Sequence, residues 1–276
     1  MSSSSMAHAS NMARASVAVL AVALASACTS VKATPTETAM MDSALARPVL
    51  PASKVERDAA DQQDLLAQAT FWGKEYEKNP NEYEASLKFA RALRGIGSSQ
   101  RASEVASQAL NFKPGDVDLA MVFAQASLDV GKAEPAATAL ARAEAGAEGN
   151  WRMLSLIGVT LDQLGQHAAA QGYYIRALAI TPDNPKILSN LGLSYALGGD
   201  APRAEQTLRS AAALPEADPR VRQNLVLVLG VQGKFAEAEK AAGPDTPKAL
   251  IESNTAYFRA LLTPARSWDT LRGTQN

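Results

Sequence analysis

A segment near the middle of the chain, Trp151–Asn184, reads WRMLSLIGVTLDQLGQHAAAQGYYIRALAITPDN. Apolar residues recur at helical spacing in its first half and again in its second half, and Gly165 separates the two halves. Pro182 follows the second half and ends a helix there, because proline lacks an N–H group and restricts the residue before it. The segment therefore predicts two amphipathic helices joined by a short turn.

The same pattern recurs every 34 residues. The turn glycine recurs at Gly97, Gly131, Gly165, Gly199 and Gly233. A small residue of the second helix recurs at Ala102, Ala136, Ala170, Ala204 and Ala238. A large apolar residue of the first helix recurs at Phe89, Phe123, Ile157, Leu191 and Leu225.

This residue code at this period resembles the tetratricopeptide repeat (TPR), and it predicts an all-α TPR solenoid of about five helix-turn-helix repeats. The expected repeats are Tyr83–Asp116, Val117–Asn150, Trp151–Asn184, Pro185–Asp218 and Pro219–Glu252. Terminal units of such stacks are atypical because each covers an exposed end. We expect residues 54–82 to form an N-terminal capping half-repeat, 247–262 a closing helix that completes the solenoid of 83–262, and 263–276 a loose tail.

Composition narrows the function classes. The net charge of −1 lacks the basic excess that nucleic-acid binding requires, so no nucleic-acid partner is expected. Aromatic residues are only 5% of the chain, which suits alanine-rich stacked helices. Of the two histidines, His8 precedes the repeats and His167 is expected in a solvated turn, and no phosphate-binding or nucleophile motif occurs. The sequence predicts a protein that is not an enzyme and has no cofactor, metal site or small-molecule substrate.

The N-terminus is typical of an export signal. Arg14 precedes the apolar run 15–25, which is too short to cross a bilayer and ends in small residues. The true start can be Met1, Met6 or Met12, and residues 1–27 are expected to be removed. Cys28, the single cysteine, directly follows the small residues, as in a bacterial lipobox, although Ala25 stands where leucine is usual.

Two processing routes remain open for this N-terminus. In the first, Cys28 carries the lipid and residues 28–53 form a flexible linker, which predicts an outer-membrane lipoprotein facing the periplasm. In the second, ordinary cleavage after Ala27 leaves a free thiol on a soluble periplasmic protein. We expect the first.

Register along the repeats predicts where a protein partner binds, because the first helix of each TPR lines the binding groove. The sixth repeat position holds Lys88, Val122, Leu156, Asn190 and Asn224, and the last two resemble the asparagine ladder of some TPR proteins. An amide both donates and accepts, so it can hold the main chain of a peptide. A basic row beside it consists of Arg152, Lys186 and Arg220. An apolar floor consists of Val159, Leu193 and Leu227. The alternative is that these residues only face solvent or cap local backbone.

One resemblance goes beyond the generic repeat. The run VRQNLVLVLGVQGKFAEAEKAA (Val221–Ala242), followed by NTAYFRALL (Asn254–Leu262), is similar to the C-terminal part of the TadD-like TPR lipoproteins of the tight-adherence (Tad/Flp) pilus assembly system. The resemblance implies an outer-membrane scaffold that helps assemble the pilus secretion apparatus, with the secretin or associated components as partners. Two alternatives stay open: a pilotin or scaffold of another envelope machine, and a regulatory subunit of a peptidoglycan or polysaccharide enzyme.

Overall fold

The computed structural model describes residues 50–243, 247, 249, 252–253 and 256. The described helices lie in the unit that begins at Pro51. The expected signal peptide, Cys28, most of the linker and the C-terminal tail lie outside the described residues, as does most of the expected closing helix. Twelve α-helices and one short 3₁₀ helix make up this part of the chain, and it contains no strand. The prediction of an all-α fold is confirmed.

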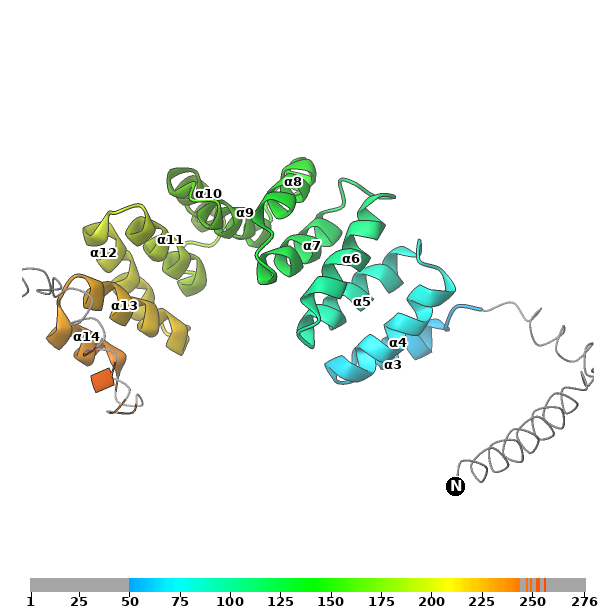
Figure 1. Ribbon diagram of the computed structural model, residues 1–276, viewed down its shortest axis with the longest axis horizontal. Coiled ribbons are helices and arrows are strands. Elements are labelled where there is room, and N and C mark those ends of the chain that lie inside the picture. The colour runs from blue at the N-terminus through cyan, green and yellow to red at the C-terminus, as the bar shows by residue number, and fades with distance from the viewer. Residues whose placement is uncertain (1–49, 244–246, 248, 250–251, 254–255, 257–276) are drawn as a thin grey trace, which may run out of the picture. The chain divides into compact units, whose positions relative to one another are not determined.

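Ten of the helices form five consecutive pairs, which follow one another in chain order (Figure 1). The first helices of the pairs are α5 (Tyr83–Gly95), α7 (Val117–Asp129), α9 (Trp151–Gln163), α11 (Pro185–Leu197) and α13 (Pro219–Val231). The second helices are α6 (Ser99–Leu110), α8 (Ala133–Ala143), α10 (His167–Ile180), α12 (Ala201–Ala212) and α14 (Phe235–Ala242). The 3₁₀ helix η1 (Glu144–Gly146) follows α8.

The turn inside each pair has one geometry, and glycine makes it possible. The five turn glycines take φ between 74° and 85°, a region that side chains with a Cβ rarely enter. In the third pair, Gly165 has φ 74°, and the N–H of Gln166 donates to the carbonyl of Leu161 at 2.8 Å. This six-residue closure is the Schellman motif, and the other four turns repeat it. The turn therefore satisfies the last carbonyl groups of each first helix.

The start of each first helix is also fixed by a side chain that recurs every 34 residues. The residue just before the helix accepts hydrogen bonds from the free N–H groups of the first turn. These caps are Glu82, Asp116, Asn150, Asn184 and Asp218. Four of the five second helices lack such a side-chain cap, and only Asp200 before α12 provides one.

The core runs both within the pairs and between them. Large apolar residues of one helix fill the space left by small residues of the next, so that Ala102, Ala136, Ala170 and Ala204 are fully buried. Gly158 and Gly192 play the same part in α9 and α11, where a neighbouring ring or leucine occupies the place of a Cβ. Because each pair also buries apolar residues against its neighbours, stability depends in part on the interfaces between repeats.

Two helices, α3 (Lys54–Asp61) and α4 (Leu65–Lys78), precede the first pair and cover its open side. Trp72 of α4 is fully buried, and its indole N–H donates to Asp61 at 3.2 Å. The charged groups of Arg57 and Lys88 each lie 5.6 Å from the centroid of its ring. Lys88 also forms an ion pair with Asp61, so this sixth-position residue belongs to the N-terminal cap.

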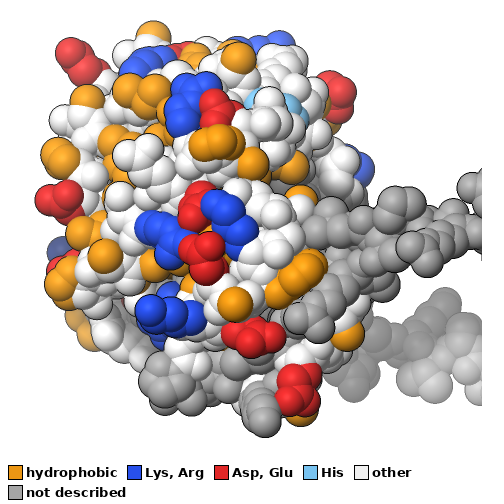
Figure 2. All heavy atoms as spheres, turned by 90° about the vertical axis from the view of Figure 1, so that its left-hand side faces the viewer, with side chains coloured by type: hydrophobic (Ala, Val, Ile, Leu, Met, Phe, Trp, Pro, Cys, Tyr) orange, Lys and Arg blue, Asp and Glu red, His pale blue; other side chains and the backbone are white. Residues whose placement is uncertain are grey.

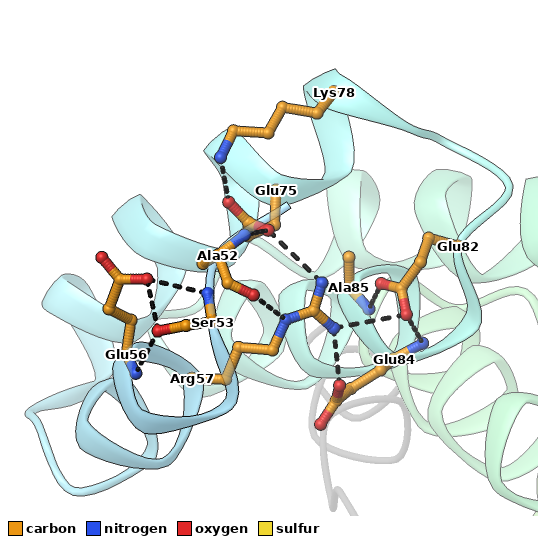
Figure 3. Close-up of polar contacts among 9 residues, drawn as sticks. All are labelled: Ala52, Ser53, Glu56, Arg57, Glu75, Lys78, Glu82, Glu84 and Ala85. Carbon is orange, nitrogen blue, oxygen red and sulfur yellow. Dashed lines mark hydrogen bonds and ion pairs between the residues drawn. The ribbon is translucent and has the colours of Figure 1, made fainter. Parts of the chain in front are cut away.

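A buried carboxylate ties these elements together (Figure 3). Glu75 is 4% exposed and accepts a hydrogen bond from the N–H of Ala52 at 2.8 Å and others from Arg57 and Lys78. Burial raises the pKa of Glu75, but the hydrogen bonds from Lys78 and Ala52 and the charges of Lys78 and Arg57 lower it more. The net pKa lies below its ordinary value, so the ionised carboxylate is the form that the fold favours.

The same arginine continues the network into α5. Its guanidinium donates to Glu84 at 2.6 Å and to Glu82 at 3.4 Å, and Glu82 is also the N-cap of α5. Arg57 of α3 therefore links α4 to the first repeat, as Figure 3 shows.

Candidate functional site

The candidate site is the surface formed by the five first helices, which we call the first-helix face. Each first helix contacts the first helix of the next repeat. Two side-chain contacts join neighbouring first helices: Arg91 of α5 pairs with Asp118 of α7 at 2.6 Å, and Asn224 of α13 donates to Ser189 of α11 at 2.9 Å. The first helices therefore lie side by side, and the 34-residue period repeats each position along this face.

The predicted basic row lies in the first turns of α9, α11 and α13. Arg152, Lys186 and Arg220 are all exposed, and within the described part of the chain none forms an ion pair. Arg152 lies over the ring of Trp151, 4.4 Å from its centroid. The partial positive charge of a helix N-terminus disfavours a cation in the first turn, so the row does not stabilise its own helices.

The two asparagines of the predicted ladder are both half-buried, but their environments differ. Asn224 donates through Nδ2 to the hydroxyl of Ser189, which is 4% exposed. Asn190 makes no side-chain hydrogen bond to any residue that the structure describes. The amide of Asn190 is thus free to receive a ligand, whereas Asn224 keeps one N–H group in an internal bond.

The predicted apolar floor is unevenly exposed. Val159 and Leu193 are half-buried against the core, whereas Leu227 is 43% exposed. Two further residues join it that the sequence analysis missed, Leu197 at 61% exposed and Val231 at 55%. They lie four residues after Leu193 and Leu227, and this helical spacing is the signal that could have revealed them.

Two neighbouring helices consequently present the same kinds of side chain in the same order. The order is basic, asparagine, apolar, apolar, at positions i, i+4, i+7 and i+11. On α11 these residues are Lys186, Asn190, Leu193 and Leu197. On α13 they are Arg220, Asn224, Leu227 and Val231.

The N-terminal part of the first-helix face has different chemistry. Arg91 pairs with Asp118, and Arg94 pairs with Asp129 at 2.8 Å, so charges on α5 are neutralised by charges on α7. Exposed apolar side chains together with unpaired cations occur instead on α11 and α13. The helices α11 and α13 therefore differ from α5 and α7 in combining uncompensated positive charge with exposed apolar surface.

A polar cluster joins the third and fourth repeats and accounts for His167. Asp162 accepts hydrogen bonds from Tyr174 at 2.9 Å and Ser194 at 2.8 Å, and it lies 2.9 Å from Nδ1 of His167. Burial and the charge of Asp162 raise the pKa of Tyr174 far above its ordinary value, so the phenol stays protonated and donates. The ring of His167 is 24% exposed, and its place in this cluster is structural.

Two features are absent from the described residues, a metal-binding cluster and a membrane-spanning helix. Nowhere do three His, Cys, Asp or Glu side chains come together as metal ligands would. None of the described helices combines the length and the apolar character needed to cross a bilayer. Cys28, the predicted lipidation site, lies outside this part of the chain.

Comparison with known proteins identifies the fold. No family model and no curated protein sequence matches the chain. The TPR protein TTC0263 of Thermus thermophilus is 22% identical, with a TM-score of 0.55 over 64% of this chain and 98% of that one. The TPR protein YrrB is 16% identical, with a TM-score of 0.51 over 68% and 99% of the two chains. MamA is 20% identical, with a TM-score of 0.51 over 59% and 94%. The chain has the fold of a TPR solenoid.

Proposed function

We propose that this protein is a non-enzymatic adaptor that binds a segment of a protein partner on α11 and α13 of the first-helix face. The observation that carries the proposal is the identical order of basic, asparagine and apolar side chains on these two helices. Each helix presents these four positions at least partly to solvent, and a surface without a ligand has no need to repeat their chemistry in this way. The structural neighbour YrrB is described as having an unusual peptide-binding site, which agrees with such a role.

Each row of the site supplies a different part of recognition. The amide of Asn190 can donate to and accept from a peptide main chain, independently of its sequence. Leu197, Leu227 and Val231 supply apolar contacts that become favourable when a ligand removes them from water. Lys186 and Arg220 attract acidic side chains or a C-terminal carboxylate. An extended or helical segment with apolar and acidic residues fits this surface.

The cellular setting of the proposal rests on the sequence. The similarity of Val221–Ala242 and Asn254–Leu262 to TadD-like lipoproteins supports a role in assembling the Tad/Flp pilus secretion apparatus. We propose that lipidated Cys28 anchors the protein to the outer membrane, facing the periplasm, and that residues 28–53 let the repeats reach the secretin or its associated components.

Deletion of the gene, followed by quantitative imaging of surface pili, tests this setting. Complementation uses the wild type, Cys28→Ser and the double variant Asn190→Ala/Asn224→Ala. Loss of pili that only the wild type restores supports both the anchor and the binding face. Unchanged pili after deletion would reject the pilus role, and co-purification with a cell-wall or polysaccharide enzyme would then identify the alternative.

A second arm tests the binding face alone. The partner captured by the wild type is compared with that captured by Asn190→Ala/Asn224→Ala, with circular dichroism to show that the fold is intact. Undiminished capture by a folded double variant would remove the asparagines from the binding site. Lys74→Ala, on the exposed surface of α4, serves as the control and is expected to capture the partner normally.

A further inference from the structure

Two hollows lie between successive second helices, and each is also lined by the first helix that connects them. One hollow lies between α6 and α8, with Phe123 among its lining residues, and another lies between α12 and α14, with Leu225 among them. The two occupy the same position in the repeat, because their shared lining positions differ by three repeats of 34 residues. Ser107 in the first hollow corresponds to Arg209 in the second, and Thr138 corresponds to Lys240.

The two hollows differ in charge although they share a register. The α6–α8 hollow is lined mainly by apolar and neutral side chains, with Arg142 as its only charged residue. The α12–α14 hollow is lined by Arg209, Arg222, Lys240 and a single acid, Glu237. Figure 2 looks onto the end of the molecule that carries α12, α13 and α14 and shows basic and acidic side chains next to one another.

Ion pairs account for only part of the positive charge. Arg209 forms ion pairs with both Glu205 and Glu237, and Glu205 also forms an ion pair with Lys234. In contrast, neither Arg222 nor Lys240 has an ion pair or hydrogen bond among the residues that the structure describes. Two cations therefore border this hollow without an acidic partner.

The other residues that line the α12–α14 hollow are apolar, and most of them are alanines. Leu225 is 4% exposed, and Ala212, Ala213 and Ala241 stand around it, in a hollow of about 440 Å³. Arg222 is held beside the end of α14, where its Nε lies 3.7 Å from the position of a Cβ on Gly243. Gly243 has φ 80° and ψ 166°, a conformation that is essentially limited to glycine. The hollow thus combines room for an apolar side chain with two adjacent cations.

We propose that the α12–α14 hollow binds a partner segment in which an acidic side chain stands next to a large apolar one. The carboxylate pairs with Arg222 and Lys240, and the apolar side chain packs on Leu225 and the alanines. Charge complementarity selects this occupant, because the equivalent α6–α8 hollow, of about 250 Å³, has the same place in the repeat but lacks the two cations. The site shares helix α13 with the proposed binding face but none of its side chains, so variants of the two sites can be tested separately.

The test uses the full mature chain, labelled with ¹⁵N, and the blocked peptide acetyl-Gly-Leu-Glu-Leu-Gly-amide. We expect the peptide to shift backbone amide signals of α12 and α14 and to leave those of α6 and α8 unchanged. Raising the salt concentration to about 0.5 M is expected to weaken the shifts, because exposed charges are then screened. The same peptide with Gln in place of Glu is expected to bind several-fold more weakly.

Variants assign the effect to the two cations. Arg222→Gln and Lys240→Gln are each expected to weaken binding roughly 2- to 5-fold, the range of one exposed ion pair. Arg222→Lys and Lys240→Arg are expected to retain it, and Arg142→Gln, in the α6–α8 hollow, is the matched control that should bind as the wild type does. Thermal unfolding checks that each variant is folded.

Several results would overturn the proposal. These are equal shifts in both hollows, equal binding of the Glu and Gln peptides, or folded Arg222→Gln and Lys240→Gln variants that bind normally. Two further probes separate the sources of the anion. Shifts from inorganic phosphate that match those from the Glu peptide would indicate a simple anion site, and preference for a neutral peptide with a free C-terminus would indicate a terminal carboxylate.

Discussion

The ring of Tyr174 occupies the space beside Gly158: a Cβ added to Gly158 would stand 2.6 Å from Cε1 of that ring. The ring cannot easily move away, because Tyr174 is 1% exposed and its hydroxyl donates to Asp162. The next repeat has the same arrangement, with Leu208 at 2.6 Å from the corresponding position on Gly192. A glycine in the first helix thus admits a large side chain of the second helix.

Gly158→Ala is therefore expected to destabilise the protein. Overpacking a core costs about 1–3 kcal/mol, and the better helix propensity of alanine offsets up to about 1 kcal/mol of that. We expect a net loss of about 1–2 kcal/mol in the free energy of unfolding, measured by urea titration. Gly172→Ala is the control, because it lies within α10 with no atom within 4 Å of its Cβ position, and it should gain about 0.4–1 kcal/mol. Equal stability of the two variants would contradict this account.

Gly165→Ala tests backbone strain in the absence of a clash. No atom lies within 4 Å of the Cβ position of Gly165, yet its φ of 74° is costly for alanine. We expect a loss of about 1–2 kcal/mol in the same urea titration. Gly165→Asn should lose less, since asparagine tolerates the left-handed region. If alanine and asparagine proved equally damaging, conformational strain would not be the cause.

Glu75→Gln tests the buried network of the N-terminal cap. The pKa of Glu75 is lowered in the folded protein, so the unfolded state binds the proton more tightly. Its contribution to stability is present above the ordinary pKa of 4.5 and is lost as the pH falls through the lower folded value. At pH 7 the variant should lose about 1.5–3 kcal/mol, the range for hydrogen bonds to a charged group.

The acid dependence of this variant is the sharper measurement. Between about pH 6 and pH 3 the free energy of unfolding of Glu75→Gln should fall less steeply than that of the wild type. Glu77→Gln, an exposed acid on the same helix, should follow the wild-type curve. Parallel curves for Glu75→Gln and the wild type would show that this carboxylate does not contribute to the acid response.

The two asparagines of the binding face are expected to differ in their effect on stability. Asn224→Ala leaves the buried hydroxyl of Ser189 without its partner and should cost about 1–3 kcal/mol. Asn190→Ala breaks no described hydrogen bond and should change stability by less than about 0.5 kcal/mol. Thermal and urea unfolding measure both.

A compensating variant completes this comparison. Ser189→Ala in the Asn224→Ala background removes the hydroxyl and should recover part of the loss. Recovery in the double variant would attribute the cost of Asn224→Ala to the unpaired hydroxyl. A loss that persists unchanged would instead point to packing around Asn224.

The sequence alone predicts the features that repeat with a fixed period. Gly165 and its four equivalents are visible because the left-handed turn demands glycine at one position of every repeat. The rows on α11 and α13 are visible for the same reason, since helical spacing and a 34-residue period place them together. Both kinds of feature depend on local backbone geometry, which is determined by the residues of a single repeat.

Contacts that occur only once could not be predicted in this way. The sequence predicts His167 in a solvated turn, but its side chain is only 24% exposed and lies beside Asp162. Asp162 also accepts hydrogen bonds from Tyr174 and Ser194, which are 12 and 32 residues further along the chain. Lys88 occupies a groove position by register but pairs with Asp61 of the N-terminal cap. These pairings depend on how helices rotate against one another, and packing of the whole stack determines that rotation.

The matching rows on α11 and α13 also bear on how a ligand finds its place. A short segment that contacts only one helix meets the same four kinds of side chain again one repeat further along the chain. Two equivalent registers double the number of bound states, which favours binding by about 0.4 kcal/mol but leaves the position undefined. On α9, Leu156 replaces the asparagine and Gln163 the last apolar residue, so the series stops there. A segment long enough to span both helices has a single register, and ligand length thereby becomes a determinant of specificity.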